Sequence, residues 1–200
     1  RLEAREPVDR FQPLVAREAT LALENNRITA NALLREPNSD RAVTAAAIVH
    51  DLGTGAGHAD LDVEALQFDA RLQPDTLTPL ALGVIANANG TVQGRGRIDW
   101  NAQTVTSRGE FSTSSLDFAA AFGPVRGVSG TVTFTDLLGL VTAPDQRLRI
   151  KSFNPGIQVD EGELLYELRP GYELVVQGGR WPFIGGELIL EPTTTHLGVA

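Results

Sequence analysis

Residues 146–151 (QRLRIK) alternate between polar and apolar side chains from Arg147 onward. Leu148 and Ile150 stand at every second position, with basic residues between and beside them. Successive side chains of a β-strand point to opposite faces of its sheet, so this spacing predicts a strand with one apolar and one polar face. The same alternation recurs in residues 162–168, 173–177 and 187–191. The C-terminal region therefore predicts a sheet whose apolar face has to be covered by something.

Earlier parts of the chain follow the same period and add turn signals. Residues 19–23 and 27–35 alternate on either side of Asn25 and Asn26. Asparagine tolerates the left-handed backbone conformation that a tight hairpin turn requires. These residues therefore predict a β-hairpin.

The apolar positions change phase within residues 58–72. Leu61 and Val63 fall on odd positions, whereas Leu66 and Phe68 fall on even positions. A change of phase inside one strand moves every later side chain to the other face unless an extra residue restores the pattern. This segment therefore predicts a β-bulge or a bend.

Two segments depart from the strand period and predict short helices. Residues 75–86 begin with possible capping residues and contain Leu77 and Leu80, although Pro79 limits where a helix begins. Residues 115–122 group Leu116 with Phe122 before a Gly-Pro pair. The chain as a whole reads as about twelve strands with one or two short helices, and strand and helix do not alternate regularly. We predict a mainly β, antiparallel fold.

The composition excludes several classes of function. The chain has 17 basic and 25 acidic residues, and a net charge of −8 disfavours binding to nucleic-acid phosphates. It has no cysteine, so it forms no disulfide and uses no thiolate. It has no methionine, even at position 1, and we expect it to be part of a longer protein. The longest apolar stretch, residues 80–88, is too short to span a membrane.

Motifs typical of enzymes are incomplete in this chain. Residues 94–96 (GRG) lack the third glycine of a dinucleotide-binding turn, and residues 53–57 lack the lysine of a phosphate-binding loop. His58, Asp60, Asp62 and Glu64 would share one strand face, about 6.6 Å apart in successive pairs, which brings at most two ligands to one ion. A solvated acidic face explains them better. We therefore predict no catalytic residue, no metal site and no cofactor.

Four short motifs in the C-terminal half occur in an order that is similar to a known family. They are GTVTFTDL at 130–137, NPG at 154–156, RWPF at 180–183 and GGEL at 185–188. This succession resembles the C-terminal domain of the YdbH-like proteins, a domain also labelled "dicarboxylate transport". These proteins belong to the AsmA-like bridge proteins of Gram-negative envelopes. The resemblance runs from about Leu72 to the end of the chain. Its structural signature residues are Asn154, Pro155, Gly156, Trp181, Pro182, Phe183, Gly185 and Gly186.

The resemblance implies a fold, a function and a location. It implies a curved antiparallel sheet that forms an elongated hydrophobic groove, with residues 1–200 as a single segment of a larger periplasmic bridge protein. Residues 1–72 would supply the N-terminal strands and residues 73–200 the family-like part. The implied function is non-enzymatic: phospholipid passes between the inner and outer membranes with its acyl chains sliding along the groove. The implied partners are phospholipid acyl chains, an inner-membrane anchor elsewhere in the full-length chain, and a small outer-membrane lipoprotein that adds strands to the open edge.

The apolar strand positions are the predicted lining of this groove. They are Ile98, Trp100, Val132, Phe134, Leu148, Ile150, Leu164, Tyr166, Leu168, Leu174, Val176, Leu188 and Leu190. The last strand, residues 187–191, is the predicted docking edge, because the unpaired backbone of an edge strand invites strand addition.

Two other interpretations remain open from the sequence. A structural or protein-interaction β-sandwich would cover both apolar faces with each other and leave no groove. A small-ligand domain of the dicarboxylate-binding type would need a pair of arginines to clamp two carboxylates, and no such pair is evident. The first interpretation requires the sheet to close on itself.

Overall fold

The computed structural model describes residues 10–197. Within this range the chain forms thirteen β-strands in one antiparallel sheet and two short 3₁₀ helices. The strands are β1 (Val15–Glu24), β2 (Arg27–Arg35), β3 (Ala42–Asp51), β4 (Gly57–Phe68), β5 (Ala86–Trp100), β6 (Val105–Ala120), β7 (Gly123–Asp136), β8 (Val141–Thr142), β9 (Gln146–Phe153), β10 (Val159–Arg169), β11 (Glu173–Phe183), β12 (Gly186–Leu190) and β13 (Thr193–His196). The helices are η1 (Pro74–Thr76) and η2 (Pro79–Ala81). The predicted mainly β fold is confirmed.

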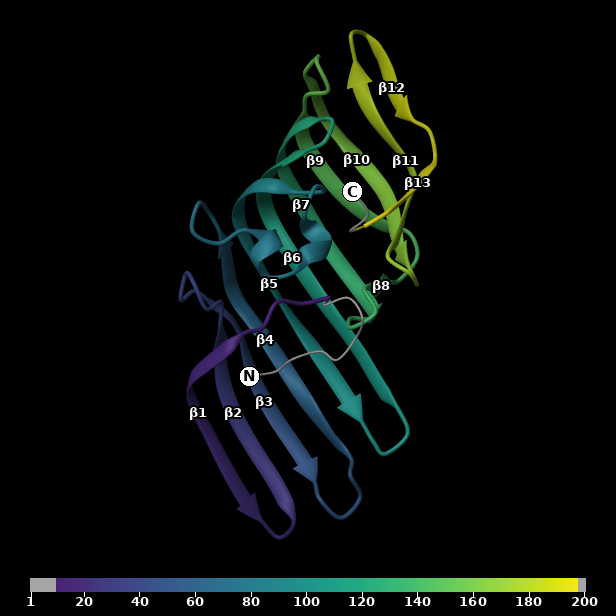
Figure 1. Ribbon diagram of the computed structural model, residues 1–200. Coiled ribbons are helices and arrows are strands. Elements are labelled where there is room, and N and C mark those ends of the chain that lie inside the picture. Colours follow the sequence, from purple (N-terminus) through teal and green to yellow (C-terminus); the bar gives the residue numbers. More distant parts are fainter. Residues whose placement is uncertain (1–9, 198–200) are drawn as a thin grey trace.

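The strands follow one another in space in nearly the order in which they occur in the sequence. The sheet runs from β1 to β12, with the two-residue β8 beside β7 and with β13 beside β11. Strand β1 forms one edge, and β12 and β13 form the other, so the sheet does not close on itself. Both edges come forward of the middle in Figure 1, and the sheet is therefore curved. The predicted curved sheet is confirmed, and the sandwich interpretation is wrong.

The local signals that set the register are those expected from the sequence. Asn25 and Asn26 form the turn between β1 and β2 with φ of 48° and 62°, the left-handed pair of a tight hairpin. The pairing of β4 with β5 shifts between Val63 and Leu66, so both side chains are buried on the same face. The predicted bulge is confirmed, and it keeps the apolar side of β4 turned inward.

The predicted helices are the main error at the level of elements. Residues 75–86 form only the two 3₁₀ turns η1 and η2, because Pro79 has no N–H to continue a helix and Thr78 instead caps η2 by accepting from the N–H of Leu80. Residues 115–122 are not helical: β6 continues to Ala120 and pairs with β7. Leu116 and Phe118 point inward against the core, so a two-residue period governs this segment.

Residues 69–85, which join β4 to β5, cross the inner face of the sheet. We call this segment the plug. Figure 1 shows its two 3₁₀ helices in front of the middle strands. Leu72 of the plug is 0% exposed and packs with Val63, Leu66 and Phe68 of β4. The main core of the molecule is thus the contact between the plug and the concave side of the sheet.

Specific hydrogen bonds fix the plug in place. The side-chain amide of Gln73 donates to the carbonyl of Ala88 at 2.9 Å and accepts from its N–H at 2.8 Å. The N-terminal arm, residues 10–14, lies beside the plug: the N–H of Gln12 donates to the carbonyl of Leu77, and the hydroxyl of Thr78 donates to the carbonyl of Arg10. The plug is therefore an integral part of the fold.

Candidate functional site

The apolar side chains of successive strands lie on one face of the sheet, which we call the concave face. Directly paired residues of an antiparallel sheet point to the same side. The pairs run from Ala59 through Ile98 to Ser107, and from Leu148 through Leu164 to Gly179. The plug covers the same face over the middle strands. The candidate site is the part of this face that the plug leaves uncovered.

The register brings all predicted lining residues together on the concave face. They are Ile98, Trp100, Val132, Phe134, Leu148, Ile150, Leu164, Tyr166, Leu168, Leu174, Val176, Leu188 and Leu190. Their contact with a lipid stays a prediction. Their surroundings differ, however, because one part of the face is open and another is packed.

The open section lies on β1 to β6, at the ends of these strands away from the plug. One row of paired residues runs from Leu23 through Ile28 and His50 to Gly57, and continues to Trp100 and Val105. The neighbouring row begins at Leu21, which is 71% exposed. Large apolar side chains exposed on an inner face are unusual for a sheet that has completed its own core. The open section can therefore accept an apolar ligand.

Trp100 shapes the floor of the open section. Its indole Nε1 donates to Nδ1 of His50 at 3.1 Å, which satisfies the one polar atom of the ring. Its ring lies against Gly57, where a Cβ would be 2.6 Å from Cζ2. The glycine lets the ring lie across the neighbouring strand and present its apolar surface.

The packed section lies on β9 to β12 and is held by aromatic rings. Trp181 is 2% exposed, and its ring centroid lies 5.0 Å from that of Phe153. Tyr166 is also buried, and burial raises the pKa of its phenol to about 12. Tyr166 therefore belongs to the protein's own packing in this structure.

The structural signature residues frame the end of the packed section. The side chain of Asn154 accepts from the N–H of Gly156 at 2.9 Å in the turn between β9 and β10. Trp181, Pro182 and Phe183 complete β11 and pair with β12 in an ordinary hairpin. Pro182 pairs with Glu187 without a shift of register, so no bulge stands at this position. The last pair of β11 with β10 involves Arg180, so Pro182 lies beyond that ladder and its missing N–H costs no bond there.

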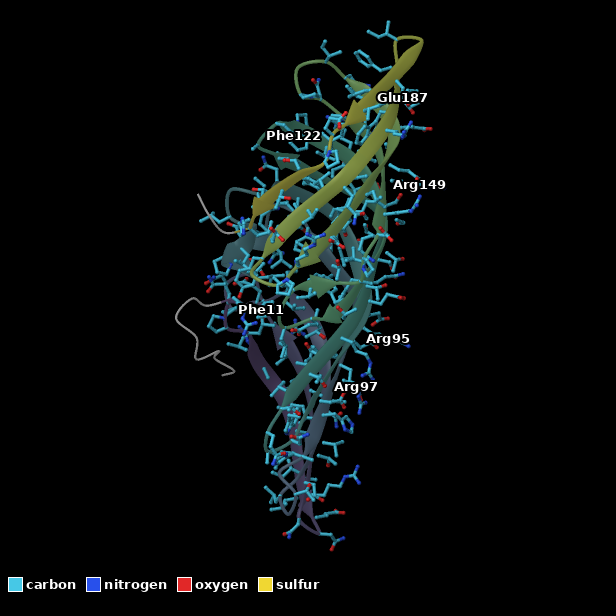
Figure 2. All side chains as sticks on the ribbon, turned by 90° about the vertical axis from the view of Figure 1, so that its right-hand side faces the viewer. Phe11, Arg95, Arg97, Phe122, Arg149 and Glu187 are labelled. Carbon is cyan, nitrogen blue, oxygen red and sulfur yellow. The ribbon has the colours of Figure 1, made fainter. Side chains whose placement is uncertain are left out.

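The opposite face of the sheet is polar, and several of its charges are paired. Arg97 contacts Asp60 at 2.8 Å and Asp99 at 2.9 Å. Figure 2 shows Arg95, Arg97 and Arg149 on the side away from Phe11 and Phe122. The acidic positions of β4 therefore form the expected solvated face, and their arginine neighbours are engaged by carboxylates. His58 lies 3.7 Å from Asp60, but residues 10–197 contain no group of three or more acidic or histidine side chains arranged to hold a metal.

A hollow of about 770 Å³ crosses β1 to β5. Its centre follows a row of small residues that includes Ala19, Ala32, Ala46 and Gly96. Its lining also includes polar-face residues such as Asp60. These small residues pair through Leu61 in one row, two residues along from the row of Leu21, so the hollow lies on the concave face.

The plug is the feature that sequence reasoning missed. The signal was present as Leu77 and Leu80 on either side of Pro79, which we interpreted as a helix, and as Leu72, which we placed in the strand of residues 58–72. Leu137, in the turn after β7, was missed in the same way: it lies over Gly96 and Gly109, where an added Cβ would be 2.8 and 3.3 Å from its Cδ2. The sequence alone does not show which distant strands the plug and Leu137 cover.

Comparison with known proteins connects this architecture to a function. Residues 1–198 match the model of the YdbH-like family, described as "Intermembrane phospholipid transport protein YdbH". The chain belongs to this family. The match begins at residue 1, so it includes the N-terminal strands, where the motifs gave only a faint resemblance. No curated protein and no solved structure is significantly similar to the chain.

The family description places the chain in phospholipid transport. An open sheet with an apolar inner face suits that role, because it offers hydrocarbon a surface without a polar pocket. No helix within residues 10–197 is long and apolar enough to cross a membrane.

Proposed function

We propose that the concave face holds the acyl chains of phospholipids that move between two membranes. The observation that carries this proposal is the open section, where large apolar side chains such as Leu21 and Leu23 are exposed on the inner side of an unclosed sheet. A domain that served only as a structural module would gain stability by covering these side chains. Their exposure therefore favours a lipid-binding surface.

The energetics favour binding without a specific pocket. Each buried methylene contributes roughly 0.8 kcal/mol, so immersion of part of two acyl chains is sufficient to hold a lipid. Leucine, isoleucine and tryptophan line the open section, and no single position offers a much stronger contact than its neighbours. We therefore expect chains to slide along the face, with the headgroup in water and with little headgroup selectivity.

The plug limits where the chains lie. It occupies the concave face beside β4 to β7, and the aromatic residues fill much of the face beside β9 to β11. We therefore place the acyl chains on the open section of β1 to β6 first. The remaining predicted lining residues, from Val132 to Leu190, stay part of the proposal as a continuation of the same face.

The edges of the sheet are the proposed points of connection. Strand β12 has β11 on one side only, and its other side carries unpaired backbone groups within the described residues. Such an edge can accept a strand from another chain. We propose that a small outer-membrane lipoprotein adds there, in the periplasm, while the full-length protein is anchored in the inner membrane.

The test is lipid retention by variants of β1. Leu21 and Leu23 face inward, and Thr20 and Ala22 alternate with them and face outward. In the chain with Leu21→Glu and Leu23→Glu, we expect retained phospholipid, measured by mass spectrometry after purification, to fall about tenfold or more, because each leucine contact contributes about 1.5–3 kcal/mol. The matched control with Thr20→Glu and Ala22→Glu should retain lipid normally. A folded inward-facing variant with undiminished lipid would overturn the proposal.

A further inference from the structure

Three hairpin turns at one end of the sheet carry exposed, large apolar side chains. Phe122 lies between β6 and β7, Ile157 between β9 and β10, and Ile184 between β11 and β12. Strands β6, β9 and β11 run in the same direction in the sheet, so these turns lie at the same end. The turn of Ile184 forms the upper extremity of the molecule in Figure 1. We call these three turns the apolar tips.

The apolar tips differ from the other turns of the sheet. Residues 121–122, 154–158 and 184–185 contain no charged side chain, whereas residues 36–41, at the same end of the N-terminal strands, include Glu36 and Arg41. Most turns at the opposite end are polar, as at Asn25 and Asn26, and the leucines of the turn at residues 137–140 are half-buried. Within the described chain, Leu52 is the only exposed large apolar residue in those opposite turns.

Ile184 stands in a backbone conformation that does not suit it. Ile184 and Gly185 have φ of 45° and 76°, the same left-handed pair that Asn25 and Asn26 adopt in the first hairpin. A β-branched residue is strongly disfavoured there, and asparagine is the usual choice. Ile184 is nevertheless 86% exposed, so it gains no compensating contact within the chain. A contact outside the chain explains both the residue type and its position.

An aromatic path joins the tips to the concave face. The ring of Phe122 lies 6.1 Å from that of Phe153, which in turn lies 5.0 Å from that of Trp181. Phe122 is exposed at the tip, whereas Trp181 is buried on the concave face. The apolar surface therefore continues from the interior of the sheet to its protruding end.

The shape and charge of the tips fit a lipid bilayer. A protein partner would present a complementary hollow, but these side chains protrude from separate hairpins and together suit a soft, continuous apolar medium. A net charge of −8 makes electrostatic attraction to anionic lipids unfavourable, so the contact has to be apolar. The family transports phospholipid between membranes, so its members have to exchange lipid with a bilayer.

We propose that Phe122, Ile157 and Ile184 insert into the surface of a phospholipid bilayer. This inference rests on the lipid-carrying function proposed above, but it concerns a separate surface from the open section. In this proposal, the end of the sheet that carries the turn between β11 and β12 contacts the membrane.

The first test uses the fact that the chain has no cysteine. Ile184→Cys, Ile157→Cys and the control Leu52→Cys each allow one environment-sensitive NBD label. With phosphatidylcholine vesicles, labels at 184 and 157 should show a blue shift and brighter emission, and the label at 52 should not change. The shift should persist at high salt, because no charge pairing is involved. No shift at 184, equal shifts at 184 and 52, or loss of the shift in salt would each overturn the proposal.

The second test separates membrane contact from lipid carriage. The triple variant Phe122→Ser, Ile157→Ser, Ile184→Asn should lose flotation with phosphatidylcholine vesicles while keeping its thermal transition and its retained phospholipid. The chain with Leu21→Glu and Leu23→Glu should lose retained lipid and still float. Flotation of the folded triple variant at the unmodified level would refute the membrane contact and leave the open section unaffected.

Discussion

At the scale of single residues, glycines opposite aromatic rings determine the shape of the concave face. The ring of Trp181 lies against Gly162 and Gly179, where a Cβ would stand 2.0 and 2.2 Å from ring carbons. An aromatic ring can lie across a neighbouring strand only where that strand carries no side chain. The ring therefore packs flat against the backbone of the neighbouring strands on the inner face of the sheet.

Gly162→Ala tests this arrangement. The added methyl group would meet both the ring of Trp181 and the carbonyl of Arg180, the latter at 2.3 Å. We expect the free energy of unfolding, measured by urea denaturation, to fall by about 1–3 kcal/mol or more. Gly186→Ala is the matched control, because its nearest neighbour is 3.6 Å away, and it should change stability by no more than about 0.5 kcal/mol. Equal effects of the two substitutions would contradict this account.

Tyr166 gives a pH dependence with a definite sign. Burial raises the pKa of its phenol from 10.0 in the unfolded chain to about 12 in the folded protein. Between these values the folded state keeps a proton that the unfolded state loses, so stability falls as the pH rises from about 10 to about 12. The free energy of unfolding falls by an amount on the order of 2–3 kcal/mol across this range. Urea denaturation across this range should show a steeper decline for the natural chain than for Tyr166→Phe; parallel curves would disprove the assignment.

Residue patterns predicted the two faces of the sheet well, and for a physical reason. The two-residue period of a strand is a local property, so the shared face of Leu148 and Ile150 follows from spacing alone. The burial of Tyr166 could not be predicted this way, because burial depends on which distant segments of the chain cover that face. Spacing indicates which face a side chain occupies and does not indicate what covers that face.

At the scale of elements, the plug divides the concave face into a covered part and an uncovered part. It converts the middle of an open sheet into a packed core centred on Leu72 and leaves the open section to one side. Its hydrogen bonds through Gln73 resemble those of a fixed core element. The plug therefore sets the length of apolar surface that remains for a ligand.

Leu72→Ala tests the structural role of the plug. Leu72 is fully buried, and its truncation should lower the free energy of unfolding by about 2–5 kcal/mol. Leu82→Ala, in the same segment but exposed, should change it by no more than about 0.5 kcal/mol. Urea denaturation of both variants gives the comparison. A small effect of Leu72→Ala would mean that the plug is a loosely held cover.

The sequence predicted those elements whose signals are local. Its predictions were wrong for elements whose conformation depends on pairing with distant segments. The Asn25-Asn26 turn and the bulge between Val63 and Leu66 follow from residue type and phase. The segment around Leu116 has a spacing compatible with a helix or a strand, and its pairing with β7 decides in favour of the strand. The plug combines both difficulties, because its apolar residues have no regular period and its contacts span the sheet.

At the scale of the whole molecule, the sheet is defined by its open edges and by its unequal inner face. A sheet of this width that does not close has to cover its apolar side with its own segments, with a ligand or with a neighbour. The plug and the N-terminal arm cover the middle. The open section on β1 to β6 remains, and we propose that phospholipid covers it, because the chain belongs to a phospholipid transport family.

Photocrosslinking along β1 tests this account most directly. A photoreactive phenylalanine analogue is placed in turn at Leu21 and Leu23, which face inward, and at Thr20 and Ala22, which face outward on the same strand. The account predicts phospholipid adducts, identified by mass spectrometry, at positions 21 and 23 and none at positions 20 and 22. Adducts in equal yield at all four positions, or none at 21 and 23 in a lipid-bearing sample, would contradict it.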